Sequence, residues 1–100
     1  EEAVSRVMQG VDACMNALPY YFNLDMTRLA VRNGVHYSDL GGNTEIVFRQ
    51  QELDAEARER GVSVIPDCGL APGMVNILAA AGIAELDEPE SWLARAGATA

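Results

Sequence analysis

Residues 34–44 read GVHYSDLGGNT, in which a short run typical of a buried strand, VHYSDL, ends in a loop of two glycines and an asparagine. A helical pattern follows over 46–60, and another strand pattern, VSVIP, occupies 62–66. Strands that alternate with helices of about ten to fifteen residues are joined by right-handed crossovers and form a parallel sheet. The stretch therefore predicts a β–α–β unit of an α/β fold.

The same alternation extends upstream of this unit. The sequence predicts a helix over 1–9, a strand over 11–18 that is ended by Pro19, and a helix over 23–33. The side-chain oxygen of Asn23 is expected to cap that second helix. Together with the two strands of the β–α–β unit, the strand over 11–18 makes three predicted strands. A helical pattern follows each of them, the last one over 74–84.

Downstream, residues 74–84 are apolar nearly all round and predict a helix that needs burial on more than one side. Residues 87–100 show no clear periodicity, and we treat them as a tail. The order of the elements predicts an α/β fold, a partial Rossmann-like parallel sheet of three strands with flanking helices.

Length, charge and cysteine usage limit the class of protein. A chain of 100 residues is at most one domain, and because this one begins with Glu1 we expect a trimmed or excised chain. A net charge of −8 with scattered basic residues argues against nucleic-acid binding. The sequence shows no leader pattern and no run long enough for a bilayer, so a soluble, cytoplasmic protein without a membrane partner is expected. Cys14 and Cys68 are expected to be buried free thiols, and their spacing predicts no metal site.

The candidate site lies where the three predicted strands end. In open parallel sheets, ligands bind beyond the carboxyl ends of the strands. Three segments directly follow the strands and combine glycines or prolines with polar or aromatic residues: 17–21 (ALPYY), 39–43 (DLGGN) and 67–73 (DCGLAPG). We expect these segments to converge on one site.

Each candidate residue in these segments has a functional and a structural interpretation. Asp39 and Asp67 can orient a substrate amine or act as a base, or each can cap its own loop through backbone amides. The free N–H groups between Gly69 and Gly73 suit a phosphate, a carboxylate or the nicotinamide amide, or the segment is a plain turn. His36 lies inside a strand pattern, which favours a structural role over catalysis.

The sequence contains no G-x-G-x-x-G, the turn that holds a dinucleotide pyrophosphate after the first strand of a Rossmann sheet. The strands here would therefore be the fourth to sixth of such a sheet. Strand four normally pairs with strand one, so the edge of residues 12–18 is expected to be bare. We expect self-association, and thus a homo-oligomer, through that edge or through the helix over 74–84.

Three segments resemble lysine 6-dehydrogenase and its saccharopine dehydrogenase relatives: 17–23 (ALPYYFN), 34–44 (GVHYSDLGGNT) and 65–78 (IPDCGLAPGMVNIL). The resemblance covers roughly residues 10–90. It implies that residues 1–73 form the C-terminal half of a Rossmann-like NAD(P)-binding domain and that residues 74–100 form the start of a catalytic domain. The tail from Trp92 to Ala100 departs from the family pattern.

The resemblance also implies the chemistry, which is hydride transfer between NAD(P) and an amino-acid carbon that bears nitrogen. In the lysine 6-dehydrogenase branch, the ε-amine of L-lysine is oxidised to an imine, which hydrolyses to allysine and ammonia. The roles it implies are grouped by function: catalytic, Asp39 and Tyr20; cofactor-binding, Ala17, Leu18, Pro19, Gly69, Leu70 and Gly73; substrate-binding, Tyr21, Asn43 and Asp67.

Two alternatives stay open at this point. In the first, the complete enzyme to which this chain belongs is a saccharopine or carboxynorspermidine dehydrogenase relative. In the second, the chain is a non-catalytic α/β assembly module. The chain alone is expected to bind NAD or NADP weakly or not at all and to be inactive, because the Gly-rich turn is missing. The residue that distinguishes NAD from NADP would follow the second strand of the complete domain, outside this sequence.

Overall fold

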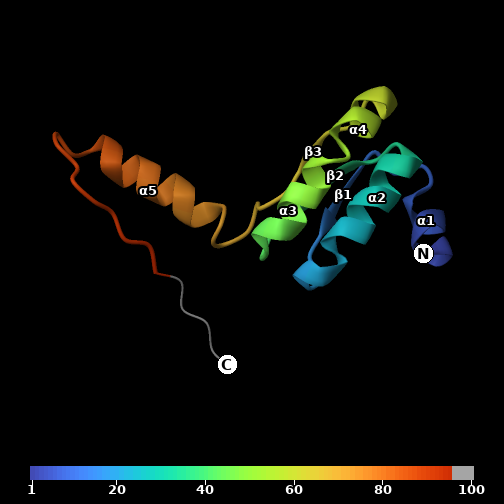
Figure 1. Ribbon diagram of the computed structural model, residues 1–100, viewed down its shortest axis with the longest axis horizontal. Coiled ribbons are helices and arrows are strands. Elements are labelled where there is room, and N and C mark those ends of the chain that lie inside the picture. The colour runs from blue at the N-terminus through green and yellow to red at the C-terminus, as the bar shows by residue number, and fades with distance from the viewer. Residues whose placement is uncertain (96–100) are drawn as a thin grey trace.

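The computed structural model describes residues 1–95 and contains a three-stranded parallel sheet (Figure 1). The strands are β1 (Ala13–Asn16), β2 (His36–Asp39) and β3 (Val64–Ile65), and they lie side by side in chain order. Both pairs are parallel, with Cys14 opposite Tyr37 and Tyr37 opposite Val64. The predicted fold class is confirmed.

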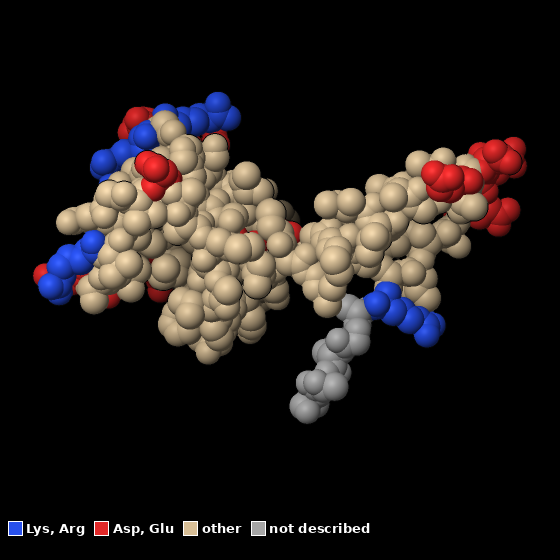
Figure 2. All heavy atoms as spheres, turned by 180° about the vertical axis from the view of Figure 1, so that it is seen from behind, with Lys and Arg blue, Asp and Glu red and all other residues tan. Residues whose placement is uncertain are grey.

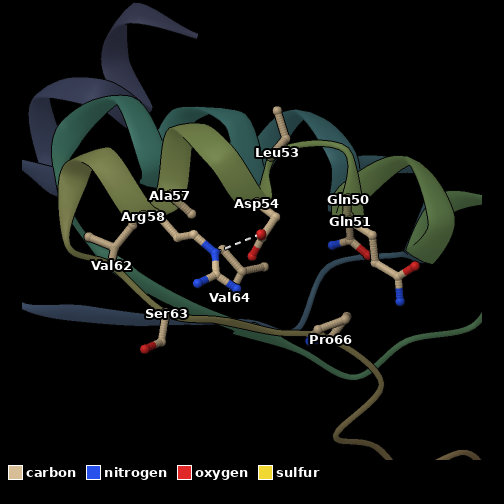
Figure 3. Close-up of a pocket in the computed structure, with 10 residues that line it drawn as sticks. All are labelled: Gln50, Gln51, Leu53, Asp54, Ala57, Arg58, Val62, Ser63, Val64 and Pro66. Atoms are coloured by element: carbon tan, nitrogen blue, oxygen red, sulfur yellow. Dashed lines mark hydrogen bonds and ion pairs between the residues drawn. The ribbon is translucent and has the colours of Figure 1, made fainter.

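The helices before β3 all lie on one side of the sheet (Figures 1 and 3). They are α1 (Glu2–Met8), the short 3-10 helix η1 (Tyr20–Phe22), α2 (Asn23–Asn33), α3 (Thr44–Gln51) and α4 (Asp54–Arg60). The core lies between α1, α2 and the sheet, and it is formed by Met8, Leu29, Ala30, Val35 and Tyr37. No helix of residues 1–95 covers the opposite face of the sheet, which is called the uncovered face below.

The link from α2 to β2 shows how the sequence directs a crossover. Gly34 ends α2 in the left-handed conformation, with φ +71°, and its N–H bonds back to Val31 O. The next residue, Val35, donates to Ala30 O at 2.9 Å and is fully buried. Because the glycine reverses the chain within one residue, β2 enters the core directly below the helix that precedes it.

The prediction of a single helix over 46–60 is wrong, because two helices, α3 and α4, occupy that stretch. α3 ends at Gln51, and α4 begins at Asp54 after one turn in which Leu53 N donates to Gln50 O. Gln50 is held in the protein interior by side-chain hydrogen bonds. This anchor fixes α3, and the short turn lets α4 take its own direction toward β3.

α5 (Met74–Ala84) forms where the sequence predicts it, but it stands away from the rest of the chain (Figure 1). None of its residues is buried. The radius of gyration is 16.2 Å, against about 13 Å for a compact domain of this length. Residues 1–95 therefore do not bury the apolar surface of α5.

Both cysteines are free thiols, but the expectation that both are buried is wrong. Cys14 is half-buried against the core, and this burial raises the pKa of its thiol. Cys68 is exposed in the loop after β3. Within residues 1–95, no helix combines the length and the apolar character that crossing a membrane requires.

Candidate functional site

The three strand-end segments meet at the carboxyl edge of the sheet, as the sequence predicts. Tyr20 lies against Gly42, because a Cβ added at that glycine would come within 3.0 Å of the Tyr20 Cβ. A Cβ at Gly41 would overlap the Asp67 carboxylate, and one at Gly69 would overlap the Leu40 carbonyl. Since these glycines lie at points of closest approach, larger residues there would force the loops apart.

Asp39 ties two of these loops together. Its Oδ1 accepts the Gly41 N–H at 2.8 Å and the Asp67 N–H at 3.1 Å, and its backbone oxygen accepts the Cys68 N–H at 2.9 Å. The side chain is 0% exposed. This geometry fits the interpretation in which the carboxylate caps loops, and contact between Asp39 and a substrate would require the loops to open.

The second oxygen of Asp39 belongs to a buried polar network beneath the loops. Asp39 Oδ2 accepts from the Tyr37 hydroxyl at 3.1 Å and from Gln50 Nε2 at 2.7 Å. Gln50 Nε2 also donates to Thr27 Oγ1 at 2.7 Å. Burial raises the pKa of the Tyr37 phenol, so this hydroxyl remains a neutral donor. The network connects α2 and α3 to the end of β2.

The same network reaches the end of β1. Asn16 Nδ2 donates to Asn23 Oδ1 at 2.9 Å, and Asn16 Oδ1 accepts the Leu18 N–H at 3.0 Å. Asn23 Nδ2 donates to Gly41 O at 3.4 Å. The expected capping role of Asn23 is therefore wrong, because its side chain bonds to Asn16 and Gly41 instead of the first turn of α2.

The segment 17–19 continues from Asn16 along this edge, and Leu18 is exposed. The aromatic residues of η1 follow it. The Tyr20 and Tyr21 rings meet edge-on with centroids 5.6 Å apart, and both side chains are exposed. Together they form the aromatic border of the candidate site.

Asp67 lies at this edge, and its carboxylate is only partly buried. It has φ +62°, a backbone conformation uncommon for residues other than glycine, although Asp tolerates it better than most. Desolvation, followed by the negative charge of Asp39, raises the pKa of its carboxyl above the usual value. Asp67 is consequently better placed than Asp39 to exchange a proton or meet a substrate.

The N–H groups of the two glycines that bound the loop 69–73 are engaged, and Gly69 N donates to Pro72 O at 3.1 Å. Gly73 N donates to Asn76 Oδ1 at 2.9 Å, Met74 N to Gly69 O at 2.8 Å, and Val75 N to Leu70 O at 3.0 Å. The start of α5 thus satisfies its own donors, which fits the interpretation as a structural turn. Leu70 exposes its side chain beside this turn.

Asn43 and His36 have structural partners. Asn43 Oδ1 caps α3 by accepting the Ile46 N–H at 3.2 Å, so its expected substrate role would compete with the cap. His36 lies on the uncovered face, where its Nδ1 accepts the Ser63 N–H at 2.9 Å and joins β2 to β3. This contact agrees with the structural role favoured for His36.

The sequence analysis missed the residues that organise the site, which are Asn16, Thr27, Tyr37 and Gln50. Each is a buried polar side chain within an otherwise apolar run or helix face. The alternation of Tyr37 with Asp39 on one face of β2 was the available signal, because it places two polar groups toward the core. Gln50 gave no such signal, since glutamine is ordinary on a helix surface.

A separate groove of about 590 Å³ lies between α4 and β3 (Figure 3). Ala57, Val62 and Val64 form its apolar part, and the Asp54–Arg58 ion pair, 2.7 Å between Oδ2 and Nε, lies across it. Gln50 also lines it, and its Oε1 has no hydrogen-bond partner within the described residues. None of the predicted site residues lines this groove.

The fold and the site define a class: a Rossmann-like α/β unit whose candidate ligand site lies at the carboxyl edge of a parallel sheet. The family model of the saccharopine dehydrogenase NADP binding domain matches residues 1–65, so the chain belongs to that family. The match ends with the last residue of β3. No solved structure matches the chain.

Proposed function

We propose that this chain is the second half of the NAD(P)-binding domain of an NAD(P)-dependent amino-acid dehydrogenase, and that residues 74–100 begin its catalytic domain. Membership of the family supports the class of cofactor. The observation that carries the proposal is the joining of the strand-end loops by Asp39 at the carboxyl edge of the sheet. In parallel sheets this edge is where nucleotides bind.

The described residues fit the nicotinamide end of a dinucleotide, and they do not fit its pyrophosphate. Leu18, Leu40 and Leu70 expose apolar surface from three neighbouring loops, as a flat ring requires. The first N–H groups of α5 are occupied, and Glu45 places a negative charge in the first turn of α3. A pyrophosphate therefore has no cradle here, and binding by the chain alone is expected to be weak.

We propose L-lysine as the substrate of the complete enzyme, on the resemblance of segments 17–23, 34–44 and 65–78 to lysine 6-dehydrogenase. In this reaction, the ε-carbon gives a hydride to NAD(P)⁺ and the amine loses a proton, which leaves an imine for hydrolysis. At this edge Tyr20 is exposed and Asp67 is partly buried, so we assign them to the amine. Asp39 acts in this proposal as a positioning residue for the Asp67 loop.

A non-catalytic assembly module is the second candidate for the chain in isolation. The specific observation that favours it is α5, which has no buried residue within the described part of the chain. A saccharopine or carboxynorspermidine dehydrogenase stays an alternative for the parent enzyme, because the matched family includes saccharopine dehydrogenase by its description.

Calorimetry of the 100-residue chain with NADP⁺, NAD⁺ and nicotinamide mononucleotide tests the cofactor proposal. All three ligands are expected to bind with similar, millimolar Kd, because they share the nicotinamide end. Affinity for the dinucleotides ten-fold or more above that for the mononucleotide would reveal a pyrophosphate site and contradict the proposal. Absence of binding by all three would contradict the assignment of the loops.

The substrate is tested in the complete enzyme, which adds the Gly-rich half and the catalytic domain. Reduced cofactor is measured with L-lysine, saccharopine and carboxynorspermidine in parallel. Turnover of L-lysine with release of ammonia is the expected result. Turnover of one of the other two amines instead would replace L-lysine as the substrate and leave the family assignment intact.

A further inference from the structure

We propose that the groove between α4 and β3 is a binding site for a small uncharged molecule that has an apolar body and an N–H or O–H donor. Three features of the groove carry the proposal: a buried acceptor without a partner, an apolar inner part, and two charged side chains that pair with each other. None of the residues assigned to cofactor or substrate lines this groove, so the inference does not rest on the proposed function.

The acceptor is the side-chain oxygen of Gln50. This residue is 2% exposed, and its Oε1 has no hydrogen-bond partner within residues 1–95. In Figure 3 the Gln50 side chain points from α3 into the space between the helices and β3. A buried acceptor without a partner is energetically costly. A ligand donor that reaches Oε1 from the groove therefore stabilises the folded chain.

The orientation of the Gln50 amide is fixed by its nitrogen. Nε2 donates to Thr27 Oγ1 and to Asp39 Oδ2, both at 2.7 Å, and the Thr27 hydroxyl itself donates to Asn23 O at 2.7 Å. Rotation of the amide by 180° would turn its oxygen toward the Asp39 carboxylate and toward a hydroxyl whose proton is already used. Gln50 thus cannot satisfy Oε1 by exchanging its two ends, and the donor must come from the groove.

The inner part of the groove is apolar. The groove has a volume of about 590 Å³, which is within the range of pockets that hold small molecules. Its apolar part is formed by five side chains, those of Leu53, Ala57, Val62, Val64 and Pro66. An apolar ligand body that fills this space loses contact with water, while its donor meets the amide oxygen at the α3 end.

The two charged side chains at the groove are one acid and one base. Asp54 Oδ2 and Arg58 Nε are 2.7 Å apart, and the two side chains are 65% and 80% exposed. Because they pair with each other, they leave no net charge that would attract an ion. A charged head group would also have to lose its water to reach Gln50 Oε1, which costs more than the transfer of a neutral donor. The groove therefore favours an uncharged ligand, such as an alcohol or a primary amide.

Gln50 also connects the groove to the strand-end loops, which gives binding a second readout. Its Nε2 donates to Asp39, whose Oδ1 accepts the Gly41 N–H at 2.8 Å. A donor on Oε1 polarises the amide and strengthens the hydrogen bonds made by Nε2. We therefore expect the Gly41 amide to respond to a ligand that binds in the groove.

Amide chemical shifts of the labelled chain during titration with cyclohexylmethanol test the site. Saturable shifts are expected at Ala57, Val62 and Val64, and Gly41 is expected to follow the same curve. Cyclohexylmethyl methyl ether is the matched ligand, because it keeps the apolar body and lacks the donor. It is expected to bind about ten-fold more weakly, since it leaves Oε1 without a partner. This comparison uses the unchanged chain and is independent of any effect of a substitution on folding.

A variant of the chain tests the position of the site. Val62→Phe places a larger side chain in the groove and is expected to abolish the saturable shifts. Val11→Phe is the matched control, because Val11 also follows a glycine of positive φ after a helix and lies outside the groove. Neither valine is buried, so both variants are expected to keep the circular dichroism of the wild type.

Three results would overturn the proposal. Equal affinity for the alcohol and the ether would show that Gln50 Oε1 does not receive the donor. Tighter binding of cyclohexylmethylammonium or cyclohexylacetate would show that Asp54 or Arg58 recognises the ligand instead. The absence of saturable shifts in the groove, or shifts that persist in Val62→Phe, would show that the groove is not the site. None of these results bears on the cofactor, which is tested separately with NADP⁺.

Discussion

Asp39 is the residue on which the candidate site depends. Its two oxygens accept four hydrogen bonds, from Gly41 N, Asp67 N, the Tyr37 hydroxyl and Gln50 Nε2. A buried carboxylate that is fully paired is stable, but the loss of one suitable acceptor leaves donors without partners. The role of Asp39 is thus to fix the two loops that follow β2 and β3.

Asp39→Asn is expected to lower the free energy of unfolding by about 2–4 kcal/mol, because an amide nitrogen would face the donors of Gln50 and Tyr37. Urea denaturation followed by circular dichroism measures this change. The matched control is Asp54→Asn, which removes an exposed ion pair and is expected to cost less than about 1 kcal/mol. Equal effects of the two substitutions would show that the Asp39 network contributes little.

The titration of Asp67 gives a pH-dependent prediction. Its folded-state pKa is raised, so the ionised carboxylate opposes folding above about pH 4, where the unfolded chain has already lost the proton. Asp67→Asn keeps a residue that tolerates positive φ and removes the charge. We expect a higher Tm than wild type at pH 7 and no gain near pH 3, measured by thermal scans. A gain of equal size at both pH values would contradict this.

At the scale of elements, the regular crossovers were predictable and the buried connections were not. Gly34 and Gly61 end α2 and α4 in the left-handed conformation, a signal visible in the sequence. The break between α3 and α4 has neither glycine nor proline, and it accompanies an anchor, Gln50, whose partners are 11 and 23 residues away. Local patterns contain no information about such distant hydrogen bonds.

α5 gives a prediction at the same scale through two glycines. Gly73 has φ +128°, and a Cβ there would overlap Gly69 O, whereas a Cβ at Gly82 meets nothing within 4 Å. Gly73→Ala is expected to displace the loop from the sheet edge and reduce stability. Gly82→Ala is expected to stabilise α5 by up to about 1 kcal/mol. Far-UV circular dichroism and thermal scans compare the two, and similar effects would contradict the assigned geometry.

At the scale of the whole molecule, the chain divides into a packed unit and a projecting helix. The sheet with α1 to α4 buries a core, while residues 1–95 leave α5 and one sheet face without cover (Figures 1 and 2). The sequence indicated that the apolar helix lacked a partner, because it is apolar on every side. It could not indicate which surface the helix meets, since this depends on the direction that the loop after β3 imposes.

The central claim is that the strand-end loops form one site for the nicotinamide end of NAD(P). Amide chemical shifts of the labelled chain, followed by NMR during titration with millimolar NADP⁺, test it most directly. We expect saturable shifts at Leu18, Gly41 and Gly69 and their neighbours, with little change along the groove between α4 and β3. Shifts concentrated in that groove, or no shifts at all, would contradict the account.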